Sequence, residues 1–411
     1  MKALVVSGYP PTSPGESSHG IFKRLDNFIE ALGSEGEVDL LFFGDGDTAV
    51  TTEERTSVER ASRERWGPRV AAFLARKRSR PARPSLVDRF VKPIFSAAAQ
   101  SAFDDMSGAP QLAELESCLA RRPDLLFAHR LESMLLIMAA RRPLPPVLYD
   151  VDDVEHVKFL RFMRQPPYWR SKFLLYLQWP ALYLTERRAI GHAHTAFVCS
   201  EADQAYLRDR CGSRNVEVVP NAVRIPEATP VPTRPVLLFL GNYRYAPNCV
   251  AAEHLAQDIW PRIRAAVPDA KLVLAGRDVE KVRLPRGSAG IEARGFVADL
   301  DALYDETRVV TCPILAGGGT RFKIIEAAAY GRPVVSTTLG AEGIPFVDRR
   351  EICLADAPAP FADACIALLN DHDRCVEIAG RCREKARLLY DRERIVERVR
   401  GFARTAVAQT R

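Results

Sequence analysis

The sequence predicts an α/β protein made of two doubly wound domains, each with a parallel sheet. Short apolar runs alternate with longer amphipathic stretches along most of the chain, and this alternation is typical of β-α-β units. The length of 411 residues suits two or three domains. Four prolines within residues 226–235 predict a stiff, extended linker. We therefore expect one domain at 1–225, a linker at 226–234 and a second domain at 235–390.

The composition excludes several classes of protein. The chain is 47% hydrophobic and 27% charged, which is typical of a globular fold rather than a disordered, collagen-like or disulfide-rich chain. The net charge of +6 is a mild bias and does not indicate a nucleic-acid partner. The nine cysteines form no CxxC pair and are typical of a reducing cytoplasm. The apolar run at 3–6 is too short for a signal peptide, and no run is long enough to span a membrane, so we expect a soluble cytoplasmic protein.

The first half alternates buried strands with amphipathic helices. Strands are expected at 2–6, 38–43, 125–127, 146–149, 196–199 and 216–219. Helices are expected at 20–32, 179–191 and 201–208, and Ser200 is placed to cap the last of these. Residues 54–84 are rich in arginine and poor in large apolar side chains, so the sequence predicts a solvated, partly helical insertion there.

The second half repeats the alternation more regularly. Strands are expected at 236–241, 271–275, 291–293, 308–313 and 333–336. Helices are expected at 251–266 and 300–307, after the glycines at 317–319, and through most of the chain from 361 onward. Gly331 followed by Pro333 is a strong helix-stop signal for the helix that follows the glycines. Ligands of doubly wound sheets bind at the carboxyl ends of the strands, which directs attention to the loops that follow them.

The most informative of these loops joins a predicted strand to a predicted helix with the sequence Gly-Gly-Gly-Thr-Arg-Phe-Lys at 317–323. Glycines let the backbone approach a ligand closely, and a helix N-terminus favours an anion. Arg321 falls in the expected first turn, where a cation opposes the helix dipole unless both serve one anion. Lys323 adds a second cation. Glu326 follows on the same helix face and can accept hydrogen bonds from hydroxyl groups.

The loop does not match the two common phosphate-binding motifs. The Walker phosphate loop needs glycine directly before the lysine, where this chain has Phe322, and the dinucleotide pattern GxGxxG is absent after the first strand. Local sequence alone is also compatible with a simple tight turn, with Arg321 and Lys323 on a solvated surface.

Residues 310–343 resemble the donor-binding region of the family-4 retaining glycosyltransferases, which have the GT-B fold, in the subset with a Gly-Thr-Arg-x-Lys loop. Further matches occur in order along the chain, at Pro-Asp-Leu-Leu-Phe-Ala-His 123–129, Pro-Asn-Ala-Val 220–223, Phe-Leu-Gly-Asn-Tyr-Arg 239–244, Leu-Ala-Gly-Arg 274–277 and Gly-Phe-Val-Ala-Asp 295–299. The resemblance covers most of the chain and is weak across 45–120. It implies two Rossmann-like domains that face a central cleft, with 1–225 binding the acceptor, 235–390 binding the donor, and a final helix at 391–411 that packs on the first domain.

The family's activity is the transfer of a sugar from a nucleoside-diphosphate sugar to an acceptor hydroxyl, with retention at the anomeric carbon and usually without a metal. The resemblance implies catalytic roles for Arg321, Lys323 and His129, because the departing diphosphate needs preorganised positive charge. It implies donor binding by two further groups of residues: Gly20, Arg244 and Glu326, and the loop residues Gly317, Gly318, Gly319 and Thr320. No cofactor is expected beyond the nucleotide sugar. The acceptor is expected to be a carbohydrate, a lipid-linked molecule or a small molecule.

The chain departs from the family pattern in two places. Many members carry a glutamate eight positions before Glu326, where this chain has Gly318, so the backbone amides of 317–319 are the candidate sugar contacts. Many members also have an arginine and a lysine after the first strand of the donor domain. Here Arg244 is present, but Pro247 and Asn248 stand near the place of the lysine, so Arg321 and Lys323 are the candidate diphosphate ligands.

Several polar residues outside the loop suit structural roles as well as functional ones. A histidine at a strand end, such as His129, is often only a hydrogen-bonded structural residue. The acidic residues of 150–155, next to His156, suit loop and capping roles, with acceptor binding or a metal as alternatives. Asn221 is expected in a hinge loop.

Residues 158–188 interleave basic and aromatic side chains. They suit either contact with an anionic membrane, where a lipid-linked acceptor would lie, or ordinary helices with their aromatics in the core. Two other functions share the donor-loop features: a nucleotide-sugar epimerase of the same fold, and a sugar-nucleotide-binding protein without activity. The epimerase would need acid and base groups around the sugar, and the loop at 317–319 offers none.

Overall fold

The computed structural model describes residues 1–10, 20–46, 48–78, 85–100, 103–164, 172–285, 287 and 289–410. The chain forms two compact units. The first unit contains Met1–Pro220 together with Glu393–Arg411, and the second contains Asn221–Arg392. The proline-rich residues 226–234 therefore belong to the second unit, and the end of the chain belongs to the first.

The first unit is built on a seven-stranded sheet in the order β3-β2-β1-β4-β5-β6-β7, in which neighbouring strands are parallel. The strands are β1 (Lys2–Ser7), β2 (Glu37–Gly44), β3 (Val70–Arg76), β4 (Leu125–His129), β5 (Val147–Asp152), β6 (Thr195–Val198) and β7 (Val216–Val218). The order reverses between β1 and β4, so the ends of these two strands form the topological switch point where doubly wound sheets bind ligands.

The helices of the first unit follow the alternation that the sequence predicts. The α-helices are α1 (Gly20–Glu35), α2 (Thr52–Trp66), α3 (Lys92–Phe95), α4 (Ala109–Leu119), α5 (Arg130–Met138), α6 (Glu155–Met163), α7 (Trp179–His192), α8 (Glu201–Cys211) and α15 (Arg392–Ala408). The short segments are η2 (Val87–Val91), η3 (Ala97–Ala99), η4 (Asp104–Met106) and η5 (Lys172–Gln178). The Ser200 hydroxyl accepts a hydrogen bond from the Asp203 amide, as expected for the cap of α8.

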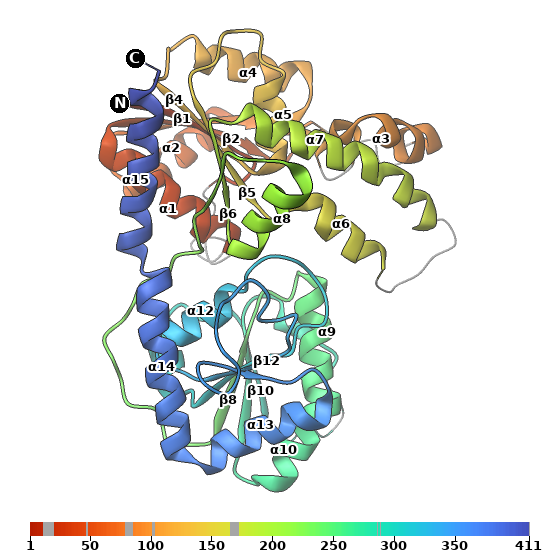
Figure 1. The fold of residues 1–411 in the computed structure, drawn as a ribbon, viewed down its shortest axis with the longest axis vertical. Helices are drawn as coiled ribbons and strands as arrows, with labels where there is room; N and C mark the ends of the chain where they lie inside the picture. Colours follow the sequence, from red (N-terminus) through yellow and green to blue (C-terminus); the bar gives the residue numbers. More distant parts are fainter. Residues whose placement is uncertain are drawn as a thin grey trace. The chain divides into compact units, whose positions relative to one another are not determined.

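The C-terminal helix α15 lies along α1 in the first unit (Figure 1). Arg400 and Arg404 both reach the carboxylate of Glu35 at the end of α1, with N–O distances of 2.7 and 2.8 Å. The ring of Phe402 packs 5.2 Å from that of Phe197 on β6. Helix α15 therefore covers one face of the sheet through both ion pairs and aromatic packing.

The prediction of a solvated insertion at 54–84 is wrong in its second part. Helix α2 is present, with a capping box at Thr51 and Glu54, but β3 then adds a complete edge strand that pairs with β2. The basic flank of this strand is tied down by acidic partners: Arg76 donates to Glu54 at 2.6 Å and Lys77 lies 3.2 Å from Asp45. Residues 79–84 lie outside the described part of the chain.

The second unit is built on a six-stranded parallel sheet in the order β10-β9-β8-β11-β12-β13. Its strands are β8 (Val236–Leu240), β9 (Lys271–Ala275), β10 (Ile291–Arg294), β11 (Val309–Cys312), β12 (Val334–Ser336) and β13 (Cys353–Leu354). Its helices are α9 (Ala246–His254), η6 (Leu255–Ile259), α10 (Trp260–Ala266), η7 (Val279–Lys281), α11 (Leu300–Glu306), α12 (Phe322–Ala329), α13 (Pro358–Asn370) and α14 (His372–Tyr390). The first of these starts five residues before the expected 251, because Pro247 suits the first helical turn.

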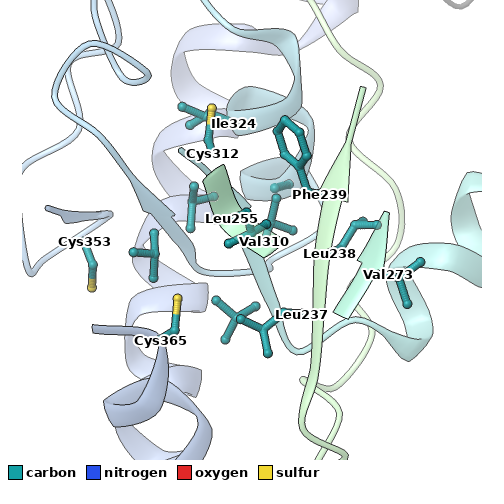
Figure 2. Close-up of a cluster of buried hydrophobic side chains, with 14 of the residues drawn as sticks. Leu237, Leu238, Phe239, Leu255, Val273, Val310, Cys312, Ile324, Cys353 and Cys365 are labelled. Atoms are coloured by element: carbon teal, nitrogen blue, oxygen red, sulfur yellow. The ribbon is translucent and has the colours of Figure 1, made fainter. Parts of the chain in front are cut away.

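The core of the second unit forms where the central strands meet the helices on both faces. Figure 2 shows Leu237, Leu238 and Phe239 of β8 beside Val310 of β11, with Ile324 of α12 above them. All five are fully buried. This packing fixes β11 and α12, which carry the glycine-rich loop between them. All nine cysteines are free thiols. In the part of the chain that the structure describes, no helix is long and apolar enough to cross a membrane.

Candidate active site

The predicted site residues divide between the two units, and each group lies where strands end. Gly20 and His129 belong to the first unit. The second unit holds the rest, which lie between β8 and α9 or between β11 and the second turn of α12: Arg244, Gly317, Gly318, Gly319, Thr320, Arg321, Lys323 and Glu326.

The backbone of the loop between β11 and α12 takes conformations that require glycine. Gly317 has a φ of 108° and Gly319 a φ of 72°, both in the left-handed region that other residues rarely adopt. A Cβ atom at Gly317 would also lie 2.7 Å from the hydroxyl of Tyr245, which is too close. The helix begins at Phe322, so Arg321 is its N-cap residue rather than a member of the first turn as expected.

The guanidinium of Arg321 folds back over its own loop. Its Nη1 donates to the carbonyl oxygens of Gly318 and Gly319. Its Nη2 is buried and has no hydrogen-bond partner among the described residues. A buried donor without a partner is costly, so this nitrogen is suited to bind a ligand at the loop.

Lys323 lies in the first turn of α12 and points toward β8. Its Nζ donates to Oδ1 of Asn248 at 2.9 Å and lies 4.1 Å from the centre of the Phe239 ring. Burial, together with the charge of Arg321, lowers the pKa of Lys323 from its usual 10.5 to about 8. A lysine with this pKa is mostly charged at neutral pH but loses its proton more readily than an exposed lysine, because none of the described residues places a carboxylate beside it.

The hydroxyl of Thr320 accepts a hydrogen bond of 2.6 Å from Nδ2 of Asn221, a buried residue at the start of the second unit. This contact ties the loop to the motif Pro-Asn-Ala-Val, 99 residues earlier. From the sequence, Asn221 is expected only in a hinge loop, so its contact with the glycine-rich loop is a role that the sequence does not reveal.

Glu326 and Arg244 flank the loop in different surroundings. Glu326 is almost fully buried, and its Oε2 accepts a hydrogen bond of 3.4 Å from the hydroxyl of Tyr304. Arg244 is well exposed and lies 3.3 Å from Asp278. The expected roles of both residues in donor binding stay predictions.

In the first unit, Gly20 begins α1 and His129 ends β4, next to the end of β1. The Nδ1 of His129 is 2.9 Å from the Ser7 hydroxyl, which also accepts from the Tyr9 amide. That arrangement favours the tautomer with the proton on Nε2. Burial and the charges of Arg130 and Arg24 lower the pKa of His129 well below its usual 6.5, so the ring is neutral. Its Nε2 is buried and has no partner among the described residues.

The acidic residues after β5 form a buried ion-pair network. Asp150 accepts three hydrogen bonds from Arg24, the shortest 2.6 Å, and Arg24 also donates to the Val219 carbonyl. Burial disfavours the charge of Arg24, but the Asp150 carboxylate raises the pKa of Arg24 above its ordinary range. Burial and the nearby Asp153 raise the pKa of Asp152 to about 7. Most of these carboxylates therefore balance buried arginines.

Two further contacts complete this region. Arg130 adopts a backbone φ of 67°, and its side chain donates to Glu155 at 2.9 Å and to the Tyr9 hydroxyl at 2.8 Å. His156 is buried, and its two ring nitrogens contact Glu186 and Tyr206. Within the described residues, no group of three or more histidine, cysteine, aspartate or glutamate side chains is arranged to hold a metal ion.

Two family models match successive parts of the chain. The model described as "Glycosyl transferase 4-like domain" matches residues 20–222, and the model described as "Glycosyl transferases group 1" matches residues 234–371. A search of curated proteins finds no match.

Solved structures of several enzymes share the fold over nearly the whole chain. Sucrose-phosphate synthase from Thermosynechococcus elongatus is 17% identical, with a TM-score of 0.70 and coverage of 99% of both chains. HepE of Anabaena in complex with UDP-glucose is 15% identical, with a TM-score of 0.65 and coverage of 98% of this chain and 100% of HepE. A variant of S. aureus TarM in complex with UDP is 12% identical, with a TM-score of 0.65 and coverage of 96% and 98%. At these identities the likeness shows the fold.

Proposed function

The chain is a GT-B glycosyltransferase of the group 1 and GT4-like families, and we propose that it moves a hexosyl group from a nucleoside-diphosphate sugar to an acceptor hydroxyl with retention at the anomeric carbon. The observation that carries this proposal is the loop before α12. There the Nη2 of Arg321, which has no hydrogen-bond partner among the residues that the structure describes, and the ammonium of Lys323 flank glycines that allow close approach of a ligand. Cations, a glycine backbone that a ligand can approach closely and a helix N-terminus together suit a diphosphate.

In the proposed reaction, the bond between the anomeric carbon and the diphosphate oxygen breaks while the acceptor oxygen bonds to the same carbon. The proton of the acceptor hydroxyl passes to the departing diphosphate. Attack and departure share one face of the sugar, so no enzyme nucleophile is needed. Arg321 and Lys323 stabilise the charge that grows on the leaving group, and such preorganised stabilisation is usually the largest catalytic contribution.

The remaining residues take supporting roles in the same proposal. The neutral His129 ring, with its proton on Nε2, donates a hydrogen bond to a hydroxyl of the transferred sugar or of the acceptor. The amide of Gly20, at the start of α1, binds the diphosphate. Glu326 accepts hydrogen bonds from the ribose hydroxyls, and the amides of 317–319 bind the sugar in place of the usual glutamate. Side-chain cations stabilise the leaving group, so the reaction needs no metal ion.

Thermal unfolding in the presence of UDP, GDP, ADP, CMP or dTDP, each with and without Mg²⁺, tests the donor site. One nucleoside diphosphate should raise Tm selectively and do so in EDTA, because a ligand that binds only the folded state stabilises it by an amount that grows with the ratio of ligand concentration to Kd. Arg321→Ala and Lys323→Ala should each weaken that shift. If both variants keep wild-type affinity and turnover, the assignment of the diphosphate site is wrong.

Product analysis then separates the rival functions. A transferase releases the nucleoside diphosphate and leaves an acceptor with the same anomeric configuration as the donor. An epimerase would change the sugar without an acceptor, and a binding protein would shift Tm but release nothing from the donor over hours.

The acceptor is proposed to belong to polysaccharide, glycolipid or natural-product synthesis, with the enzyme in the cytoplasm and touching the membrane through 158–188. Part of this segment is core, since Leu182 and Met163 are buried. Other side chains are not: Phe173 is 65% exposed and Leu177 53% exposed. The neighbouring helix α3 packs on η5 and α7, and its Phe95 is 81% exposed. Exposed apolar side chains among basic residues suit the surface of an anionic membrane. Residues 165–171 lie outside the described part of the chain.

Vesicle flotation tests the membrane contact. The protein should float with vesicles containing about 30% anionic lipid and not with neutral vesicles, and Leu177→Ser should reduce the bound fraction. Leu388→Ser is the matched control, because Leu388 is 58% exposed on α14 of the second unit. If the wild-type protein stays in the bottom fraction of the gradient at low salt, the proposed membrane contact is wrong.

A further inference from the structure

The side chain of Asn248 accepts a hydrogen bond from the ammonium of Lys323. The two residues are 75 positions apart, on α9 and α12, and the Nζ–Oδ1 distance is 2.9 Å. The other boundary of the ammonium is the buried ring of Phe239 on β8. Gly241 leaves the room for this contact, because a Cβ atom there would lie 3.4 Å from Nζ and 3.2 Å from Cγ of Asn248.

The amide of Asn248 is itself fixed in one orientation. Its Nδ2 donates to the carbonyl oxygen of Asn242 at 2.8 Å, and its backbone amide donates to the Tyr245 carbonyl at 2.9 Å. If the side-chain amide were flipped, its NH₂ would face the Lys323 ammonium and its oxygen would face the Asn242 carbonyl. The contacts with Lys323 and Asn242 therefore select the same orientation of the amide. The first turn of α9 therefore presents an oxygen acceptor to Lys323 before any ligand binds.

We propose that Asn248 is a positioning residue for the transfer reaction: it aims the Lys323 ammonium with a neutral acceptor and so leaves the full positive charge available to the donor diphosphate. The part of this inference that concerns the diphosphate rests on the proposed function. The contact between Asn248 and Lys323, and its effect on the pKa of the Lys323 amine, do not depend on that function.

The choice of a neutral amide matters because of the other groups around Nζ. The titratable groups that act on Lys323 are Cys312 on β11 and Arg321 at the start of α12, and Phe239 contributes an uncharged ring. Burial and Arg321 lower the pKa of Lys323 to about 8. A carboxylate in the place of the amide would raise that pKa but would also cancel the charge that a diphosphate needs.

Titration of the Lys323 amine tests the contact directly in the full-length protein without any nucleotide. Trace labelling with acetic anhydride between about pH 6 and 11 modifies only neutral amines, and mass spectrometry compares Lys323 with the exposed Lys271. The wild-type midpoint should lie near 8. In Asn248→Asp it should rise by at least about one unit, the shift typical of a carboxylate within about 4–6 Å. Val250→Asp adds the same charge to the same helix at an exposed position and should leave the midpoint unchanged.

A midpoint that is the same in wild type, Asn248→Asp and Val250→Asp overturns the inference. If Asn248→Asp does not fold, Asn248→Ala carries the test through nucleotide binding. The nucleoside diphosphate that binds wild type best should bind this variant about fivefold more weakly at pH 7, as expected for one lost hydrogen bond, with Val250→Ala unchanged. Equal affinity of Asn248→Ala and wild type overturns the inference as well. A wild-type protein that binds no nucleotide refutes the proposed function, and the amine titration then still decides whether the contact exists.

Discussion

The affinity of the protein for its nucleoside diphosphate should fall as the pH rises from 7 to 9. With a pKa of about 8, Lys323 is about 90% charged at pH 7 and about 10% charged at pH 9. If only the charged form binds the diphosphate well, the affinity should drop about tenfold over this range. A terminal phosphate titrates near pH 6, so the ligand keeps its charge throughout.

Isothermal titration calorimetry at half-unit steps measures this dependence, and Lys323→Arg is the control. A guanidinium stays charged to about pH 12 and above, so the variant should bind with an affinity that is flat between pH 7 and 9. Other groups, such as Asp152 with its pKa of about 7, act on both proteins equally and cancel in the comparison. The reasoning is refuted if wild type binds equally at pH 7 and 9, or if Lys323→Arg loses affinity to the same extent.

The lowered pKa of Lys323 also predicts how the free energy of unfolding changes with pH. The folded pKa of Lys323 is lower than its unfolded value of about 10.5, so the unfolded state binds more protons between pH 8 and 10.5. The unfavourable contribution of Lys323 to stability is therefore full below pH 8 and disappears as the pH rises through this window. The difference in unfolding free energy between Lys323→Met and wild type should shrink by about 1–3 kcal/mol from pH 7 to 10.5. A constant difference in urea unfolding would contradict the lowered pKa.

Three further changes test other contacts. Thr320→Val removes the acceptor of Asn221 and should weaken nucleotide binding about threefold to tenfold, while Thr320→Ser should bind like wild type; equal binding by both would show that the contact does not order the loop. Asp150→Asn leaves Arg24 with too little negative charge and should lower the unfolding free energy by about 3 kcal/mol, and a loss under about 1 kcal/mol would argue against a buried ion pair. Glu35→Gln should lower the unfolding free energy by about 0.5–1 kcal/mol at pH 7, because it removes the ion pairs with α15. Since Arg404 and Arg400 lower the pKa of Glu35 to about 2, this loss should be full above pH 4.5 and vanish as the pH falls to 2. A loss that does not change with pH would contradict these ion pairs.

The buried strands were the easiest part of the fold to predict, because a parallel strand covered on both faces is a short apolar run. The run at 271–275 coincides with β9, and the runs at 2–6 and 38–43 lie within β1 and β2. Strand β3 was not predicted, because it is an edge strand with half-buried residues and a basic flank. Its stability comes from pairing with β2 and from acidic partners such as Glu54, and neither is visible in a local window.

The candidate site divides in the same way. The glycines at 317 and 319 and the cations that follow them were predicted, because the signal is contiguous in sequence and each residue type has a local physical reason. The contacts that hold Lys323 and the loop in place were not predicted. Asn248 contacts Lys323 across 75 positions and Asn221 contacts Thr320 across 99 positions, and nothing local distinguishes either residue from other asparagines. The proline at 247 was the one available signal, since it marks the start of α9 and so places Asn248 in its first turn.

The buried Arg24 and the partly buried Arg321 and Lys323 are met by different kinds of acceptor. Arg24 in the first unit is met by a carboxylate, which is what folding stability alone favours for a buried charge. Arg321 and Lys323 are met, among the described residues, only by neutral acceptors: two backbone carbonyls and one amide. Neutral acceptors orient a cation but leave its charge uncompensated, which costs stability in the free protein. A sequence selected for stability alone would place a carboxylate there, and such local departures from the stable solution are expected at functional sites. An anionic ligand at this loop would supply the missing charge, and the glycines at 317 and 319 would let it approach the backbone closely.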